Sequence, residues 1–216
     1  MVSYFMASNL NPPVLRISGK CFLTPKQRCC AFLSCRLSCR MDSHHENRRK
    51  KLAEFSKEKL ISMIEDAAKN WLAHDGLWFL AAEAEHGMDS AIKIDTAAWE
   101  RFTVIEAKRI MERHEIKANS GLEGLKKALG FRLYAHLNVQ EIVEETPTSF
   151  IFRMNDCRVQ SARKRDNRPD FPCRPVGLVE YTKFAQTVDP RIKTECVCCP
   201  PDGHPDEFYC AWKFSL

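Results

Sequence analysis

The chain lacks any long apolar run. No stretch of its 216 residues approaches the roughly 20 apolar residues that a membrane-spanning helix needs, so the sequence predicts a soluble protein without a membrane span. It also lacks a glycine-rich phosphate loop, a nucleophile elbow and an H-E-x-x-H motif. No internal repeat of fixed period is visible. The cysteines and the hydrophobic periodicity are therefore the informative features.

Acidic residues are absent from the first 41 positions. These positions carry six Lys or Arg, whereas the other 175 residues hold 27 bases and 28 acids, so the body is nearly neutral despite a net charge of +5. A neutral body argues against a nucleic-acid partner. The basic, Ser-rich leader is typical of an organelle transit peptide, although a disordered tail or a true start at Met41 also fits this composition. We expect residues 1–45 to be a disordered leader or transit peptide, and the location to be cytoplasmic, or plastid or mitochondrial if the leader directs import.

Cysteine is absent between Cys39 and Cys157, and six of the eleven cysteines fall in the last sixty residues. A secreted disulfide scaffold would be shorter and rich in cysteine throughout. The distribution therefore predicts an intracellular protein with a local thiol site near its C-terminus.

Apolar residues recur at helical spacing over residues 55–138. We expect about four helices there: one from near Ser56, a buried one that Asp75 caps and Gly87 ends, one over 89–114, and one that a Ser120–Glu123 capping box begins and that runs to Leu137.

The period then changes to two, over the sheet-rich residues 139–216. This predicts strands near 139–145, 149–154, 157–162, 192–198 and 208–216, with one helix inserted after Pro175. Helices followed by an antiparallel sheet indicate an α+β fold, here a single ligand-binding domain over residues 46–216.

The segment "TECVCCPPDGHPDEFYCAWKF" carries the strongest chemical signal. Cys196 and Cys199 form a C-x-x-C pair, and Cys210 returns on the next strand of the hairpin. Zinc takes about four such ligands in a tetrahedron. The fourth ligand has three candidates: Cys173, His204 and Cys157. Two alternatives stay open, namely buried thiols that pack as small apolar side chains and a redox disulfide.

This C-terminal order of a short helix, the C-x-x-C pair, Asp202-Gly203 and Cys210-x-Trp212 resembles the end of the 4-vinyl reductase domain. The resemblance implies that Cys173, Cys196, Cys199 and Cys210 bind zinc, with His204 in reserve. Cys196 stands where that family has Glu, and the hairpin is a few residues longer. An all-thiolate set would also admit iron or an iron–sulfur cluster.

Residues 55–216 as a whole are similar to a group of small prokaryotic "cytosolic proteins" related to the L-2-amino-thiazoline-4-carboxylate hydrolase family. The similarity rests on "NWLAHDGLWFLAAEAEHGMDSAIKIDTAAWERF", "CRVQSAR" and "DFPC". It implies an α+β ligand-binding fold like that of the 4-vinyl reductase domain.

Two further groups of residues are candidate ligand contacts. Aromatic and polar residues crowd the junction of the first two expected helices and could line a pocket, or could be core residues: Trp71, His74, Asp75, Trp78, Glu83 and Glu85, of which Trp71, His74 and Trp78 are the candidate ligand contacts. Three others alternate along the expected strand after Cys157 and could clamp a carboxylate or phosphate, or could form a solvated edge: Arg158, Gln160 and Arg163. Cys157 itself is a weak candidate nucleophile, because no paired base is identifiable.

Together these features predict a metal-stapled domain that binds a small carboxylated or aromatic compound. The alternatives are a hydrolase of a small heterocyclic amide or thioester, and an iron–sulfur protein. The sequence predicts no oligomeric state.

Overall fold

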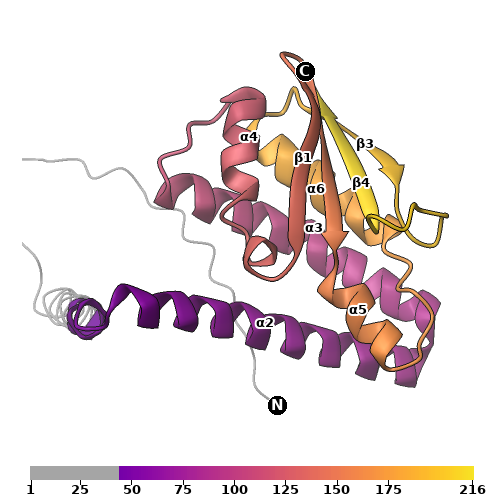
Figure 1. Cartoon of the computed structure of the whole chain (residues 1–216), viewed down its shortest axis with the longest axis horizontal. Helices are drawn as coiled ribbons and strands as arrows, with labels where there is room; N and C mark the ends of the chain where they lie inside the picture. Colours follow the sequence, from indigo (N-terminus) through magenta and orange to yellow (C-terminus); the bar gives the residue numbers. More distant parts are fainter. Residues whose placement is uncertain (1–43) are drawn as a thin grey trace, which may run out of the picture. The chain divides into compact units, whose positions relative to one another are not determined.

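The computed structural model describes residues 44–216, so the expected leader lies outside the described residues apart from its last two positions. Residues 44–53 are helical with exposed side chains, and they belong to a unit that ends at Ser56. Lys57–Leu216 form a separate compact unit, which contains the elements labelled in Figure 1. Within the described residues, no helix combines the length and apolar character that crossing a membrane requires.

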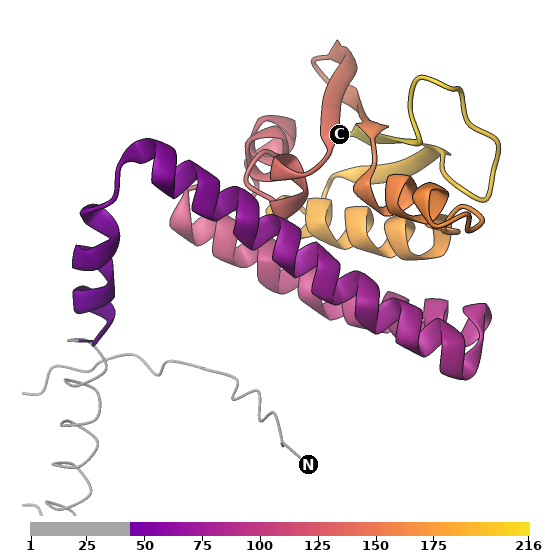
Figure 2. The same cartoon turned by 60° about the horizontal axis from the view of Figure 1, so that its bottom comes forward.

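A long helical hairpin opens this unit. Helix α2 (Lys57–His86) and helix α3 (Met88–Arg113) run side by side and are joined at Gly87, whose φ of +78° favours glycine (Figure 2). The prediction of two helices before Gly87 was wrong. Asp75 lies inside α2 rather than capping a new helix, since the segment holds no proline and a single glycine, Gly76, is tolerated within a helix. The run predicted to be buried is also partly exposed, with Leu77 at 67%.

Helix α3 buries one face and exposes Ile94 at 55%. The side chains buried along the helix are Ala91, Trp99, Thr103, Ala107 and Ile110.

Helix α4 (Gly121–Leu129) begins where predicted, but its cap is not local. Ser120 makes no capping hydrogen bond, and the Gly121 N–H donates to Asp189 Oδ2 at 3.0 Å. The predicted continuation to Leu137 was wrong, because α4 ends at Leu129 and a 3-10 helix η1 (Leu133–His136) follows.

A four-stranded antiparallel sheet follows the helices, which confirms the α+β class. Its strands are β1 (Val139–Thr146), β2 (Ser149–Asp156), β3 (Lys193–Cys198) and β4 (Cys210–Ser215). They lie in the order β1-β2-β4-β3, and Trp212 on β4 pairs with Phe152 on one side and Cys196 on the other.

The strand predicted over 157–162 was wrong, because these residues begin helix α5 (Arg158–Arg165). The two buried residues of α5 are Gln160 and Arg163, which are one helical turn apart but polar, so an apolar period could not reveal them. Helix α6 (Arg174–Val188) follows with Pro175 in its first turn, as predicted.

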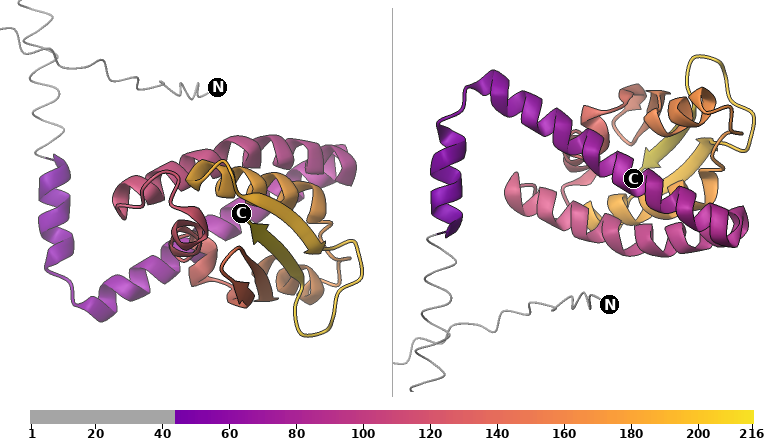
Figure 3. Two further views of the ribbon diagram at one scale, coloured as in Figure 1. Left: turned by 90° about the horizontal axis from the view of Figure 1, so that it is seen from above. Right: turned by 90° about the horizontal axis from the view of Figure 1, so that it is seen from below.

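One face of the sheet packs on α6, which lies behind it in Figure 3, left. Phe152, Trp212 and Phe214 from the strands meet Tyr181 and Phe184 of the helix. Gly177 allows the closest approach, since a Cβ there would lie 2.7 Å from Trp212 Cζ2.

Candidate functional site

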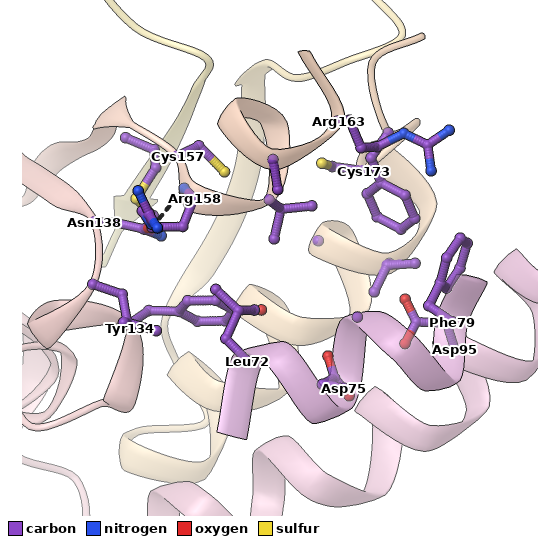
Figure 4. A pocket seen from close by; sticks show the side chains of 18 of the residues that line it. Leu72, Asp75, Phe79, Asp95, Tyr134, Asn138, Cys157, Arg158, Arg163 and Cys173 are labelled. Carbon is purple, nitrogen blue, oxygen red and sulfur yellow. Dashed lines mark hydrogen bonds between the residues drawn. The ribbon is translucent and has the colours of Figure 1, made fainter. Parts of the chain in front are cut away.

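A cavity of about 470 Å³ lies within the unit formed by residues 57–216. Residues from α2, α3, η1, α5, α6 and β4 contribute to its wall (Figure 4). Much of that wall is apolar or aromatic: Leu72, Phe79, Trp99, Tyr134, Phe171, Val176 and Trp212. Cavities with such walls and a few polar groups are the usual form of small-molecule sites.

Two carboxyl groups from the helical hairpin line the cavity. Asp75 comes from α2 and Asp95 from α3. Burial raises the pKa of Asp95 to about 7, the charges of Asp75 and Glu180 add to the rise, and a hydrogen bond with Trp99 opposes it. Burial likewise raises the pKa of Asp75, against the effect of His74. At neutral pH the Asp95 carboxyl is therefore close to half protonated and can donate or accept a proton.

A buried cluster of Arg132, Glu106 and Glu180 lies beside the part of the wall that holds Asp75 and Asp95. Arg132 is 2% exposed, its Nε donates to Glu106 Oε2 at 2.9 Å, and its Nη2 lies 2.7 Å from Glu180 Oε1. The guanidinium also lies 4.8 Å from the ring centroid of Phe184. Burial raises the pKa of Glu180 and Arg132 opposes the rise. Arg132 thus fixes the Glu180 side chain, which lines the cavity.

Basic residues of α5 and the loop after it line another part of the wall: Arg158, Arg163, Arg165 and Arg168. The Arg163 guanidinium already has partners within the protein, since it pairs with Glu83 at 3.0 Å and donates to the Pro169 carbonyl at 2.7 Å. The Arg158 guanidinium makes no ion pair with the residues that the structure describes.

Gln160 does not belong to an anion clamp. It is fully buried, and its amide exchanges two hydrogen bonds of 2.9 Å with the backbone of Phe171. The expected clamp of Arg158, Gln160 and Arg163 assumed a strand. On helix α5, only Arg158 of the three combines a place on the cavity wall with an unpaired charge among residues 44–216.

The aromatic candidates on α2 do not converge on the cavity. Trp71 packs into an aromatic cluster, with its ring centroid 5.3 Å from that of Tyr134 and 6.2 Å from that of Trp99. His74 and Trp78 are exposed and do not line the cavity. Asp75, the residue after His74, does line it.

Four cysteines line the cavity: Cys157, Cys173, Cys199 and Cys210. Side-chain interactions with Cys173 and Cys210, together with burial, raise the pKa of the Cys199 thiol. Gln160 Nε2 also donates to Cys173 Sγ at 3.1 Å. Three of the four predicted zinc ligands, from three separate segments, therefore meet at one place.

The fourth predicted ligand does not join them. Cys196 is outside the cavity wall, and its electrostatic neighbours are Arg174, Cys198, Asp202 and Cys210, so it interacts with one of the three thiols. His204 hydrogen-bonds the Pro205 carbonyl and packs on Tyr209. Over residues 44–216, no group of three or more His, Cys, Asp or Glu side chains has the geometry of a metal site. This holds for the set with Cys196 and for one with Cys157 alike, so zinc binding stays a prediction.

Cys157 is the remaining cysteine of the cavity wall and is a candidate for the fourth zinc ligand. Its thiol interacts electrostatically with Cys173 and Cys210, and Figure 4 shows Cys157 and Cys173 on the same side of the cavity. Burial raises its pKa to about 12. A thiol with this pKa is protonated at neutral pH, which disfavours Cys157 as a nucleophile.

The family model of DUF6125, described as a family of unknown function, matches residues 49–216. The chain belongs to the DUF6125 family. No curated protein and no solved structure matches this chain. The resemblances to the 4-vinyl reductase domain and to the thiazoline-carboxylate hydrolase family stay predictions, since the family description names no activity. The DUF6125 match includes all of the elements that line the cavity.

Sequence reasoning did not find Asp95, Arg132 or Glu180. Each is a single charged residue that comes together with the others only in the folded chain, so no local motif signals them. Their one sequence signal is that Asp95 precedes Trp99 by one helical turn, the spacing at which the two side chains can hydrogen-bond.

Proposed function

We propose that this DUF6125 domain binds a small molecule in the cavity between α2, α3, α5 and α6. The observation that carries the proposal is the combination of a volume of about 470 Å³, aromatic walls, and groups of opposite charge at different parts of the wall. Ligand cavities in proteins usually measure about 300–1,000 Å³ and have this composition.

The wall favours a compound with an aromatic or heterocyclic body and a carboxylate. Arg158, Arg165 and Arg168 offer cations to the carboxylate. Asp75 and Asp95 offer acceptors to an N–H or O–H group at the opposite part of the ligand. Trp212, which is 1% exposed and lines the cavity, has an indole N–H without an acceptor among the described residues and could donate to the ligand.

The first test uses matched probes and calorimetric titration. Aromatic and heterocyclic carboxylates are compared with their primary amides, which keep the shape and remove the charge. Arg158→Ala should weaken carboxylate binding at least roughly tenfold while leaving the melting temperature nearly unchanged, because an exposed charge contributes little to stability. Arg101→Ala, on the exposed part of α3, is the matched control.

A second variant blocks the cavity itself. Gly76 lines the cavity, and a Cβ at this position would meet no atom within 4 Å. Gly76→Leu should therefore fold normally and fill part of the space, whereas Gly76→Ala should still bind. If Gly76→Leu binds the same probes with unchanged affinity, or if no carboxylate binds the wild-type chain, the cavity is not the site.

We also propose that the thiols of this cavity hold zinc, with Cys157 in place of Cys196. The support is that Cys199 interacts with both Cys173 and Cys210, while Cys157 lies within electrostatic reach of the same two thiols. When bound, zinc would stabilise the contact between α5, α6 and the β3–β4 hairpin, because its ligands come from the starts of both helices and from the hairpin.

Metal analysis of the purified full chain tests this assignment. Zinc should be near stoichiometric, Cys210→Ser and Cys157→Ser should sharply reduce it, and Cys196→Ser should retain it. Cys198→Ser is the control on the same hairpin. Loss of zinc in Cys196→Ser with retention in Cys157→Ser would restore the ligand set that the resemblance implies. Absence of metal from the wild-type chain would leave buried thiols, and visible absorption would indicate iron or an iron–sulfur cluster.

A further inference from the structure

Helix α2 exposes an unusual number of large apolar side chains. Of its 30 residues, Ala68 is the one that is fully buried. Trp78 at 69% and Leu77 at 67% have the highest exposed fractions among the large apolar side chains that the structure describes. Met63 and Ile64 are 37% and 48% exposed on the same helix. A cluster of this kind marks a surface that another molecule covers.

The exposed residues follow a regular spacing along the helix. Steps of three and four alternate without interruption over residues 60–84, which is the spacing of a coiled-coil seam. All members are exposed except Leu60, which is half-buried: Leu60, Met63, Ala67, Asn70, His74, Leu77, Ala81 and Ala84. We call these eight residues the α2 seam. At 1.5 Å per residue its 25 positions extend over about 37 Å.

The α2 seam is complementary to itself when it is read in the reverse direction. Turning the series about its midpoint places Leu60 opposite Ala84, and Met63 opposite Ala81. The same operation places Leu77 opposite Ala67. Each of these layers then joins one large side chain to one small one, which is how facing layers interdigitate.

The midpoint of the series is polar. The same reversal places Asn70 opposite His74, and each of these side chains has both donor and acceptor capacity. Polar residues at a coiled-coil seam fix the register at some cost in stability. In a parallel pairing each residue would face its own copy, so that Leu77 would meet Leu77 while Ala67 met Ala67, and the layers would be uneven.

We infer that α2 pairs with α2 of a second copy of this chain as an antiparallel coiled coil centred between Asn70 and His74. The self-complementary order of the α2 seam identifies the partner as another copy, because a two-fold axis applies the same reversal. Ile64 and Trp78 each follow a seam residue by one position. They lie on one edge of the interface, where they face each other across it.

The α2 seam and the cavity wall share one residue. Leu77 belongs to both, whereas Leu72, Asp75 and Phe79, which also line the cavity, lie between the seam positions on the other face of α2. Figure 3, right, shows α2 in front of α3 and the sheet over much of its length, so the helix is accessible from that side. The α2 seam is recognised from its spacing and exposure alone, so the dimer does not depend on the proposed ligand.

The experiment is sedimentation equilibrium of the full chain from about 1 to 100 μM, a range that brackets micromolar association. Wild-type protein should approach twice the 24.9 kDa of one chain. Leu77→Glu and Ala67→Lys should each raise the dimer dissociation constant by roughly 100-fold, since each buries an unpaired charge. The double variant should recover at least roughly tenfold, because an antiparallel pairing brings the new ammonium opposite the new carboxylate.

Leu178→Glu on α6 is the matched control, since Leu178 is 44% exposed and lies outside α2. It should dimerise as the wild type does, and far-ultraviolet circular dichroism should show all variants folded. A monomeric wild-type chain, or a folded Leu77→Glu variant that still dimerises, overturns the inference. Failure of the double variant to recover overturns the antiparallel register. A mass change caused by removal of residues 1–43 would instead identify that segment as the occupant of the seam.

Discussion

Gly177 is the residue at which helix α6 most closely approaches the sheet. A methyl group there would meet Trp212 Cζ2 at 2.7 Å, and the ring has little room to move because its centroid lies 4.8 Å from that of Tyr181. We expect Gly177→Ala to lower the free energy of unfolding by about 1–3 kcal/mol through overpacking. Gly76→Ala, with free space around the new Cβ, should instead raise it by up to about 1 kcal/mol. Urea denaturation of both variants measures the difference, and equal shifts would contradict the packing argument.

Asp95 should make stability depend on pH. Its pKa is about 7 in the folded chain and roughly 3.9 in an unfolded one, so the folded state binds more protons between these values. Stability is therefore highest at acidic pH with respect to this group, falls as the pH rises from about 4 to about 7, and changes little above that.

The Asp95→Asn variant removes this titration while keeping an acceptor for Trp99. We expect the variant to unfold at a higher urea concentration than the wild type at pH 8, and to show a flatter stability profile from pH 4 to pH 7. Asp66→Asn, at an exposed position of α2, is the control. If stability depends on pH with the same slope in the wild type and in Asp95→Asn over this range, Asp95 does not carry the effect.

At the scale of the elements, the side chains of Gln160 and Arg163 tie helix α5 to the loop after it. Gln160 accepts from the Phe171 N–H and donates to the Phe171 carbonyl, both at 2.9 Å. Gln160→Met keeps the length of the side chain and leaves the Phe171 N–H unpaired, whereas the Phe171 carbonyl still accepts from the Cys173 N–H at 2.8 Å. An unpaired buried N–H costs about 1–3 kcal/mol.

We expect Gln160→Met to speed amide hydrogen exchange in residues 166–173 more than in β2 or α6, because the broken contact is local to that loop. The variant Gln186→Met, at an exposed position of α6, should leave exchange in that loop unchanged. Uniformly faster exchange across the domain would mean that α5 and the loop are not a separate unit.

At the scale of the whole molecule, the division at Ser56 separates the described domain from what precedes it. Lys57–Leu216 contain the core of the sheet and helices, and the leader shows no periodic apolar face. We expect a chain that begins at Met41 to melt within about 2 °C of the full chain, because it loses little buried apolar surface. Differential scanning calorimetry of both chains decides this, and a large loss of stability would show that the leader belongs to the fold.

The sequence by itself determined the fold class and most of the elements. Helices α3 and α6 and strands β1 and β2 follow from apolar residues at periods of 3.6 and 2, because a side chain that faces the core must recur with the geometry of its element. The same reasoning failed at α5, whose inward residues Gln160 and Arg163 are polar. It also divided α2 at Asp75, because a residue that can cap a helix can equally stand inside one.

Only the tertiary structure decided which side chains meet. The capping of Gly121 by Asp189 joins residues 68 positions apart, and the pairing of Glu83 with Arg163 joins residues 80 apart. The sequence predicted Cys173, Cys196 and Cys210 around Cys199, and the fold brings Cys173 and Cys210 to it. The raised pKa of Asp95 has the same origin, since burial and the charges of Asp75 and Glu180 come from three separate helices. Local sequence carries the period of an element, but burial and electrostatic neighbours exist only after the elements have packed.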